Sequence, residues 1–385
     1  LCICEGEQMT RARVPLSEYV TEYSVRNKAD EDIPVYSVTN SQGFCTEYFG
    51  KEVASKDKTT YKIVPRGYFA YNPSRINVGS IDWQRHEDRV IVSPLYNVFA
   101  VSDKMDKQYL YYFLRSDIGR QMIQAKAAGS VRDNLKIEML KEMTVPDITV
   151  DEQRRCAAVL DRLHGVIVLR QQQLASLDTL IKARFVEMFE GKEYCVDKLK
   201  NVCSKITDGT HKTPNYLDEG ITFISAKNIV NGELDFSDIK YISEEEYQET
   251  QKRCQTELND ILLSKSGSLG APVIVKTTEK LGLFESLAVI KYDREKLLPE
   301  FLCEQLKTDI VQRQFTTGTK GVAIKHLHLG VIGETDIIIP PVEHQEEFAD
   351  FVQQVNKSKA VVQAAHVIAR NLYSRRKQKC RILNF

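Results

Sequence analysis

The stretch MTVPDITVDEQRRCAAVLDRL, residues 143–163, joins a short apolar segment to the start of a helix. The apolar segment ends in Val-Pro, and a turn follows. Thr149 with Glu152 three residues later then forms the capping-box signature of a helix start. A second stretch, DIIIPPVEHQEEFADFVQQV at residues 336–355, has the same order of strand, turn and helix. Two such strand–turn–helix segments in one chain indicate that a structural unit is duplicated.

Both helix starts continue into apolar residues that recur at alternating steps of four and three, the heptad spacing of a coiled coil. The first series is Cys156, Leu160, Leu163, Ile167, Arg170, Leu174, Leu177, Ile181, Arg184 and Met188. The second is Phe348, Phe351, Val355, Ser358, Val362, Ala365, Ala369 and Leu372. One helix over residues 151–190 would be about 60 Å long. We expect the two helices to pair antiparallel; the alternative is that each packs only on its own globular domain.

The repeat extends beyond the helix starts. One constant offset, half of the 385-residue chain, brings identical residues together, among them Lys104 with Lys296 and Gln153 with Gln345. We call this offset the repeat shift. Between the helices, short apolar stretches alternate with Gly, Pro and Asn turns, as strands do. Helical patterns lie near 108–127 and 299–316. The sequence therefore predicts an α+β fold with two pseudo-repeated globular domains, 1–150 and 191–342, and two long antiparallel coiled-coil helices, 151–190 and 343–385.

Composition excludes several classes of protein. Lys plus Arg equals Asp plus Glu, 53 of each, so any basic surface must be local. The nine cysteines are odd in number and form no CxxC pair, so we expect neither a disulfide framework nor a zinc site. No apolar run approaches the ~20 residues of a membrane helix. Reduced thiols favour the cytoplasm; residues 1–8 receive no structural interpretation.

Two polar loops are the candidates for chemistry or binding. ITDGTHKTPNY (206–216) places His beside Asp, and LLSKSGSLG (262–270) alternates hydroxyl and ammonium donors with glycine. The chain has no GxxxxGK[ST], GxGxxG, HExxH or GxSxG motif, so catalysis has no signature. Each loop is compatible with a plain surface turn. Each is equally compatible with contacts to phosphates or base edges.

The order of motifs resembles the DNA specificity subunit of type I restriction–modification systems. The resemblance rests on KITDGTHKTPNYLDEGITFISAKNIVNGELDFSDIKYISEEEY (205–247), DILLSKSGSLGAPVIV (260–275), ESLAVIKYD (285–293) and IIIPPVEHQEEF (337–348). The first half lacks Asp-Gly-Thr-His but retains VPRGYFAYNPSR (64–75), VSPLYNVFAV (92–101) and VPDITVDEQRR (145–155). Divergence between halves is expected where each half reads a different DNA sequence.

The resemblance implies a non-catalytic subunit without a cofactor. Two target-recognition domains would each read half of a split site in double-stranded DNA. The helix pair would set the half-site spacing and dock two methyltransferase subunits, which restriction subunits then join. The alternative is a scaffold protein with no DNA role. RRKQKCR (375–381) is a local basic cluster that suits either DNA or a helix C-terminus.

Candidate residues follow from the loops and the helix series. The candidate DNA contacts are Tyr36, Ser37, Asn40, Lys58, Arg75 and Asn77 in the first domain, and Thr210, His211, Lys212, Thr213, Lys265, Ser266 and Ser268 in the second. The expected helix-pair and partner interface is Leu160, Leu163, Ile167, Leu174, Leu177, Ile181, Phe348, Phe351, Val355, Val362, Ala365, Ala369 and Leu372.

Overall fold

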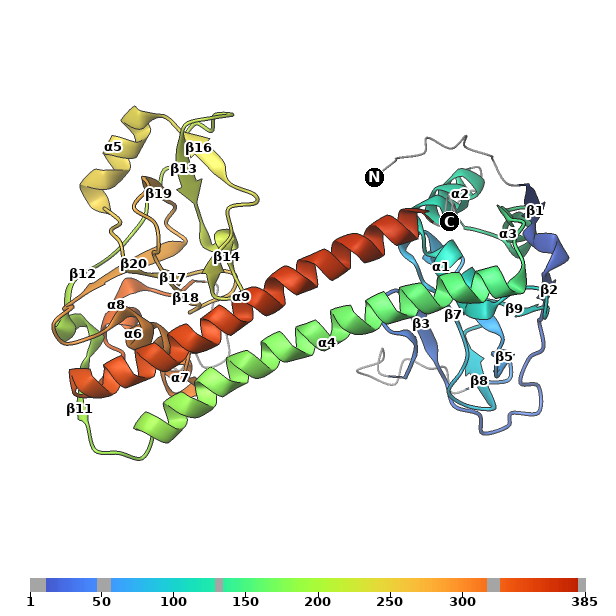
Figure 1. Cartoon of the computed structure of the whole chain (residues 1–385), viewed down its shortest axis with the longest axis horizontal. Coiled ribbons are helices and arrows are strands. Elements are labelled where there is room, and N and C mark those ends of the chain that lie inside the picture. Colours follow the sequence, from blue (N-terminus) through green and yellow to red (C-terminus); the bar gives the residue numbers. More distant parts are fainter. Residues whose placement is uncertain (1–11, 47–56, 129–133, 317–325, 380–385) are drawn as a thin grey trace, which may run out of the picture. The chain divides into compact units, whose positions relative to one another are not determined.

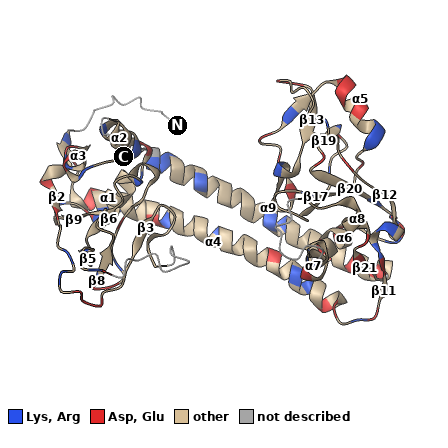
Figure 2. Cartoon of the chain, turned by 180° about the vertical axis from the view of Figure 1, so that it is seen from behind, with Lys and Arg blue, Asp and Glu red and all other residues tan. Residues whose placement is uncertain are grey.

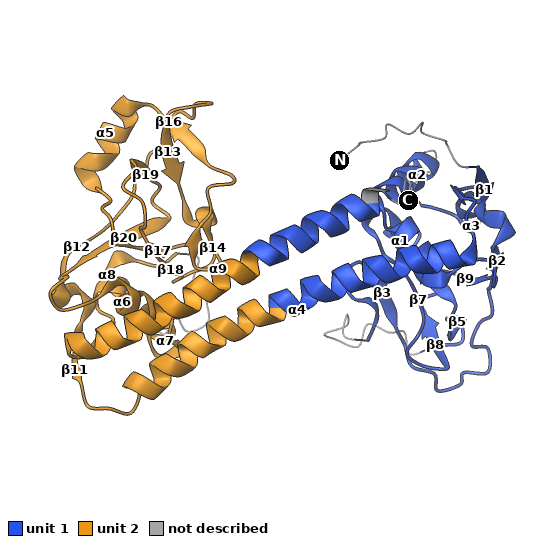
Figure 3. Ribbon diagram, viewed as in Figure 1, with its two compact units in different colours: residues 1–171, 364–385 blue, residues 172–363 orange. Residues whose placement is uncertain are grey.

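The computed structural model describes residues 12–46, 57–128, 134–316 and 326–379, and it divides into two compact units. Unit 1 lies within residues 1–171 and 364–385, and unit 2 comprises residues 172–363 (Figure 3). Each unit has a globular α+β part and half of each of two long helices (Figure 1). The predicted fold class is confirmed. Cys2, Cys4 and residues 380–381 of the basic cluster lie outside the described residues.

The long helices are α4 (Val150–Phe189) and α9 (Val342–Lys379). The predicted capping box at the start of α4 is present. The Glu152 N–H donates to Thr149 Oγ1 at 3.3 Å, and the Thr149 N–H donates to the Glu152 carboxylate at 2.9 Å. Acidic residues in both first turns suit the positive end of the helix dipole.

The helices run antiparallel within each unit. In unit 2 the Lys359 ammonium lies 2.6 Å from Asp178, and the Arg184 guanidinium lies 2.7 Å from Glu347. In unit 1 the rings of His164 and Tyr373 are 6.1 Å apart. Of the predicted residues of α4, Leu160 and Ile181 are buried within the cores of units 1 and 2, and Leu163, Ile167, Leu174 and Leu177 are half-buried; their part in a helix-pair interface stays a prediction.

The predicted seam of α9 is half right. Phe348, Val355, Val362 and Ala369 are buried, but the positions between them are Val352, Lys359, His366 and Tyr373. Phe351 and Ala365 are only half-buried, and Leu372 is 46% exposed, so placing Leu372 in the seam is wrong. The predicted and the observed stripes share Phe348, Val355, Val362 and Ala369 and differ by one residue at the positions between them. Both stripes follow the alternating spacing of four and three. Contacts with α4, such as Lys359 with Asp178, decide which stripe faces inward.

Unit 1 is built on an antiparallel sheet in the order β2-β9-β6-β7. Its strands are β2 (Val20–Glu22), β6 (Phe69–Tyr71), β7 (Ile81–Trp83) and β9 (Asn97–Val101). The two-stranded ladders are β1 (Arg13–Pro15) with β10 (Thr144–Pro146), β3 (Ser37–Thr39) with β4 (Gly43–Cys45), and β5 (Lys62–Pro65) with β8 (Arg89–Val92). The helices are α1 (Lys107–Leu114), α2 (Asp117–Ala127) and α3 (Ile137–Lys141), with 3-10 turns Leu16–Glu18 and Ile76–Val78.

Unit 2 repeats this plan with the antiparallel sheet β12-β20-β17-β18. Its strands are β12 (Cys203–Asp208), β17 (Ile261–Ser264), β18 (Pro272–Ile274) and β20 (Leu287–Tyr292). Further ladders are β11 (Cys195–Lys198) with β21 (Asp336–Ile339), β14 (Ile229–Val230) with β15 (Glu233–Leu234), and β13 (Ile221–Ile224) between β16 (Lys240–Ile242) and β19 (Leu281–Leu283). The helices are α5 (Glu244–Arg253), α6 (Pro299–Leu306), α7 (Asp309–Thr316) and α8 (Leu329–Gly333), with 3-10 turns Leu199–Val202 and Ala226–Asn228.

The repeat shift found in the sequence is also a structural repeat. It relates the first residues of α1 and α6, of α2 and α7, of α3 and α8, and of α4 and α9. The two four-stranded sheets have the same strand order, and each packs its core against the beginning of a long helix. The largest difference lies after the first strand of each sheet. Unit 2 has β13 to β16 and α5 between β12 and β17, whereas unit 1 has β3, β4 and β5 between β2 and β6. Among the described residues, no helix is long and apolar enough to span a membrane.

Candidate nucleic-acid interface

The Asp-Gly-Thr-His motif of unit 2 surrounds a buried carboxylate. Asp208 ends β12 and is 2% exposed. The ammonium of Lys265, 3% exposed, hydrogen-bonds its Oδ2, and Arg253 donates to Oδ1 through Nη2 and, at 3.1 Å, through Nε. Burial opposes ionisation of Asp208. The hydrogen bonds and charges of Lys265 and Arg253 outweigh that effect and hold its pKa below the usual value.

His211 lies at the solvent side of this ion cluster. Its Nδ1 is 2.8 Å from Glu285 Oε2, and its Nε2 is 3.4 Å from Asp208 Oδ2. Among the described residues, no group of three or more His, Cys, Asp or Glu side chains could hold a metal ion. The arrangement is an ion-pair network that shapes a loop.

Gly209 packs directly against the backbone of Leu283 and Phe284. A Cβ at this position would lie 2.2 Å from the Leu283 carbonyl oxygen, closer than real Cβ contacts. The neighbouring Thr210 N–H donates to that carbonyl at 2.8 Å, and the Glu285 N–H donates back to Thr210 O at 3.0 Å. The motif therefore turns Asp208 and Gly209 inward and leaves Lys212 exposed.

The second polar loop has a counterpart in unit 1. The Leu327 N–H donates to Lys265 O at 2.8 Å, and one repeat shift earlier the Leu135 N–H donates to Pro73 O at 3.1 Å. The β17–β18 loop, which carries Ser266 and Ser268, is thus the equivalent of the β6–β7 loop, which carries Arg75 and Asn77. The structure places these four candidates in equivalent loops of the repeat, at neighbouring positions.

A hairpin adjoins this loop in each unit. In unit 1, Arg115 donates to Gly79 O at 2.9 Å and to Asn40 O at 2.5 Å, so it joins the β6–β7 loop to the β3–β4 hairpin. In unit 2, Lys307 occupies the place of Arg115 in the repeat. Its ammonium would lie 3.6 Å from a Cβ added at Gly232, in the β14–β15 hairpin. Hairpin and loop together form what we call the loop edge of each unit.

The loop edge of unit 2 borders an open hollow of about 720 Å³ with both polar and apolar lining. Its lining is Ser225, Ala226, Lys227, Ile229, Val230, Asn231, Ser266, Gly267, Ser268, Phe284 and Ser286. The hydroxyl, amide and ammonium groups of this lining can donate to phosphate or base oxygens, and the apolar side chains of Ile229 and Phe284 lie among them. Ser266 and Ser268 are among the predicted contacts, whereas Lys227 and Asn231, which share this lining, are not. The Asn231-Gly232 pair, a hairpin-turn signature, was the available signal.

The remaining candidates divide into exposed and buried residues. Asn40, Arg75, His211, Lys212, Thr213 and Ser268 are exposed, and Tyr36, Lys58, Asn77, Thr210 and Ser266 are half-buried. Tyr36 stacks on His86 with ring centres 6.3 Å apart. Ser37 and Lys265 are buried, so the expectation that they donate to a ligand from the surface is wrong. Ser37 is the first residue of β3, all of whose residues are buried, and Lys265 is held by Asp208.

Arg85 of unit 1 was also missed. Its guanidinium lies 4.3 Å from the centre of the Trp83 ring and donates to Asp82 at 2.9 Å. Burial raises the pKa of Asp82, and Arg85 acts against that shift. An arginine held beside an aromatic ring by a carboxylate has fewer orientations to lose when it binds an acceptor such as phosphate or guanine. The signal was the mixture of aromatic and basic residues in WQRHEDR (83–89).

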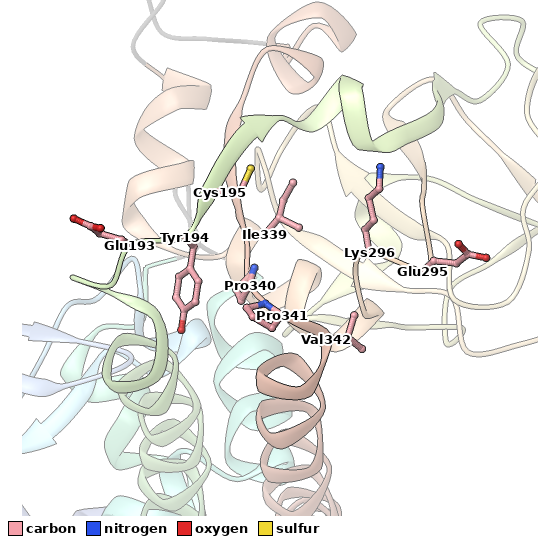
Figure 4. A pocket seen from close by; sticks show the side chains of 9 residues that line it. All are labelled: Glu193, Tyr194, Cys195, Glu295, Lys296, Ile339, Pro340, Pro341 and Val342. Carbon is pink, nitrogen blue, oxygen red and sulfur yellow. The ribbon is translucent and has the colours of Figure 1, made fainter.

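The two ends of α9 offer two further features, a basic C-terminal end and a hollow beside its start. Lys and Arg recur along α9 toward its C-terminal end (Figure 2), where Arg375 and Arg376 of the basic cluster are exposed. A hollow of about 520 Å³ lies beside the start of α9. Figure 4 shows its lining, which includes Tyr194, Lys296 and Pro340.

Comparisons with known proteins find relatives among DNA specificity subunits. Residues 191–364 match a family model described as the type I restriction modification DNA specificity domain. The chain is 22% identical over 346 residues to the type I restriction enzyme EcoBI specificity subunit of Escherichia coli, covering 79% of this chain and 72% of the relative. It is 24% identical over 276 residues to the MjaIX specificity subunit of Methanocaldococcus jannaschii, covering 65% and 62%.

Solved structures share the fold over nearly the whole chain. The crystal structure of a type I restriction–modification S subunit from M. genitalium has a TM-score of 0.55 and 13% identity, with 98% of each chain covered. A chain from a study of complex assembly and conformational transition of the type I R-M system has a TM-score of 0.58 and 17% identity, covering 98% of this chain and 99% of that one.

Proposed function

The chain belongs to the family of type I restriction–modification DNA specificity subunits, and on that premise we propose that it reads a DNA target split into two half-sites. It is a recognition subunit and not an enzyme. Residues 1–150 and 191–342 act as the two target-recognition domains, and residues 151–190 and 343–385 act as the spacer helices. The six described cysteines that are free suit a reducing cytoplasm.

The observation that carries this proposal is the repeated loop edge. Equivalent loops and hairpins recur one repeat shift apart, yet their side chains differ. Arg75 and Asn77 of unit 1 correspond to Gly267 and Leu269 of unit 2, and Ser268 of unit 2 corresponds to Ile76. The same scaffold with different donors is what reading two different half-sites requires. Ion-pair networks such as that of Asp208 hold the scaffold, and exposed donors remain for DNA.

The contacts are assigned by exposure. In unit 2 we assign Thr210, His211, Lys212, Thr213, Ser266 and Ser268, and in unit 1 we assign Tyr36, Asn40, Lys58, Arg75 and Asn77. Lysine and arginine neutralise phosphates and position each domain, whereas short hydroxyl and amide groups discriminate base edges. Because the net charge of the chain is zero, these local cations supply the salt-dependent part of the affinity.

The helices serve as spacer and docking surface for two methyltransferase subunits, which restriction subunits then join. Besides its seam, α9 carries an exposed apolar stripe of Val361, Ile368 and Leu372, which are 71%, 60% and 46% exposed. Apolar side chains in a row on a soluble helix mark a protein interface. Deleting seven residues within 163–181, with the facing heptad of α9, shortens the pair by about 10.5 Å and should shorten the preferred spacing by roughly three base pairs.

The test uses the full chain with the methyltransferase subunits of its own system. Duplexes with random sequence are incubated with the complex, and bound molecules are sequenced over several rounds. Enrichment of two short motifs at a fixed separation is the expected result. If no split motif is enriched, the chain is instead a scaffold that does not read DNA.

A further inference from the structure

Two buried glutamines occupy the same place in the two repeats. Gln153 lies in the first turn of α4 and is 1% exposed, and Gln345 lies in the first turn of α9 and is fully buried. A primary amide in such a position needs partners for both its oxygen and its N–H groups, because an unpaired buried polar atom is costly. Here every partner is a backbone group.

The hydrogen bonds of Gln153 tie the helix start to its domain. Its Oε1 accepts from the Asp106 N–H at 2.7 Å, directly before α1. Its Nε2 donates to Ile148 O at 3.1 Å and to Lys104 O at 3.5 Å. One side chain therefore joins the turn that enters α4 to the segment that enters α1.

Gln345 makes the same three bonds one repeat shift later. Its Oε1 accepts from the Leu298 N–H at 2.9 Å, and its Nε2 donates to Pro340 O at 2.8 Å and Lys296 O at 2.9 Å. Figure 4 shows Lys296 and Pro340 beside the first turn of α9. The surrounding loops differ in sequence, and the amide bridge is what both units keep.

We propose that Gln153 and Gln345 are positioning residues that set the angle between each globular domain and its long helix, and thereby the half-site spacing. Apolar packing at these helix starts is non-directional, whereas three hydrogen bonds from one rigid amide define an orientation. A rotation of about 10° displaces a point about 20 Å away by roughly 3.5 Å, close to the ~3.4 Å rise of one base pair. If the contact between a domain and the start of its long helix, here called the joint, became more mobile, the complex would accept half-site spacings that differ by one base pair. The bases read at each half-site would stay the same. This inference rests on the proposed function.

The experiment compares Gln153→Met and Gln345→Met in the full chain, assembled with its methyltransferase subunits. Methionine preserves the volume and removes all three bonds. Once the wild-type half-sites are known, binding is measured on duplexes that keep them and vary the spacing by one or two base pairs. Wild type should prefer one spacing by roughly 10-fold or more, the scale of one mismatch. Each variant should lose most of that preference and keep its discrimination against a mutated half-site.

Matched controls separate positioning from stability. Ser116→Ala and Thr308→Val remove helix caps that are equivalent under the repeat shift and lie away from the joints. They should lower the melting temperature and leave the spacing preference unchanged. If a methionine variant does not fold, Gln345→Asn, which keeps the amide but shortens its reach, replaces it. The proposal is overturned if the variants at Gln153 and Gln345 keep the wild-type preference for one spacing. It is also overturned if the control variants lose that preference to the same extent. Failure of the wild type to select any split site overturns the proposed function instead.

Discussion

Replacing Asp208 by asparagine tests whether the Asp-Gly-Thr-His motif is structural. The substitution keeps the size of the side chain and removes its charge. Lys265 then remains buried without its counterion, and Arg253 loses its acceptor on the carboxylate. Removing one partner of a buried ion pair costs about 3–5 kcal/mol. Because the amide oxygen still accepts a hydrogen bond, we expect about 3 kcal/mol of lost unfolding free energy in unit 2.

The pH dependence of this loss has a defined sign. The pKa of Asp208 is lowered in the folded state, so its contribution is complete above the unfolded pKa of about 3.9. The contribution disappears as pH falls through the still lower folded pKa. The difference between wild type and Asp208→Asn should therefore be constant from about pH 5 to 8 and shrink below about pH 4.

Hydrogen exchange of peptides from β12 and β20, followed in urea, measures the stability of unit 2. The chain's only tryptophan, Trp83, lies in unit 1 and should report an unchanged transition. Adding Lys265→Met to Asp208→Asn should recover most of the loss, since no buried charge is then left unpaired. Lys252→Ala, in an exposed ion pair, should have no measurable effect. A small loss, or no recovery in the double variant, would refute the buried-pair explanation.

Three further outcomes are expected. Gly209→Ala should destabilise unit 2 by more than about 1 kcal/mol, because the added methyl group meets a backbone carbonyl. Gly165→Ala, in open space on α4, should instead stabilise the protein by up to ~1 kcal/mol. Thermal unfolding of the two variants measures this difference. Leu160→Ala, in the core that α4 shares with its own domain, should cost about 2–5 kcal/mol, and Leu169→Ala, 65% exposed, close to nothing; equal effects in urea unfolding would contradict this assignment of the buried side of α4. Lys227→Ala should weaken DNA binding similarly on all sequences and reduce the slope of log affinity against log salt by about 1, as titrations at several salt concentrations would show.

Features carried by local signals were predictable. The capping box of Thr149 and Glu152 marks the start of α4 one residue from its observed position, because the side chains that satisfy a helix terminus are only three residues apart. The heptad series of α4 identified its buried side for the same reason. The resemblance of residues 205–247 to a known family required only linear order.

Features decided by partners distant in sequence were not predictable. Lys265 reads as a free donor in a glycine-serine loop, yet it is buried because Asp208, 57 residues away, takes its charge. On α9, two stripes satisfied the heptad spacing. The ion pair of Lys359 with Asp178 of α4 shows that the less apolar stripe, which contains Lys359, faces inward. Arg115 was no candidate, because its reach to Asn40 depends on how the β3–β4 hairpin folds back.

The sequence by itself thus determined the duplication, the two long helices and the family, since periodicity, caps and motif order are properties of neighbours along the chain. Only the tertiary structure decided which polar residues are buried and which remain for a ligand. It also decided that Gln153 and Gln345, visible before as a bare identity, bridge each helix to its domain. Burial and hydrogen bonding depend on groups brought together from distant positions, and those partners exist only once the chain has folded.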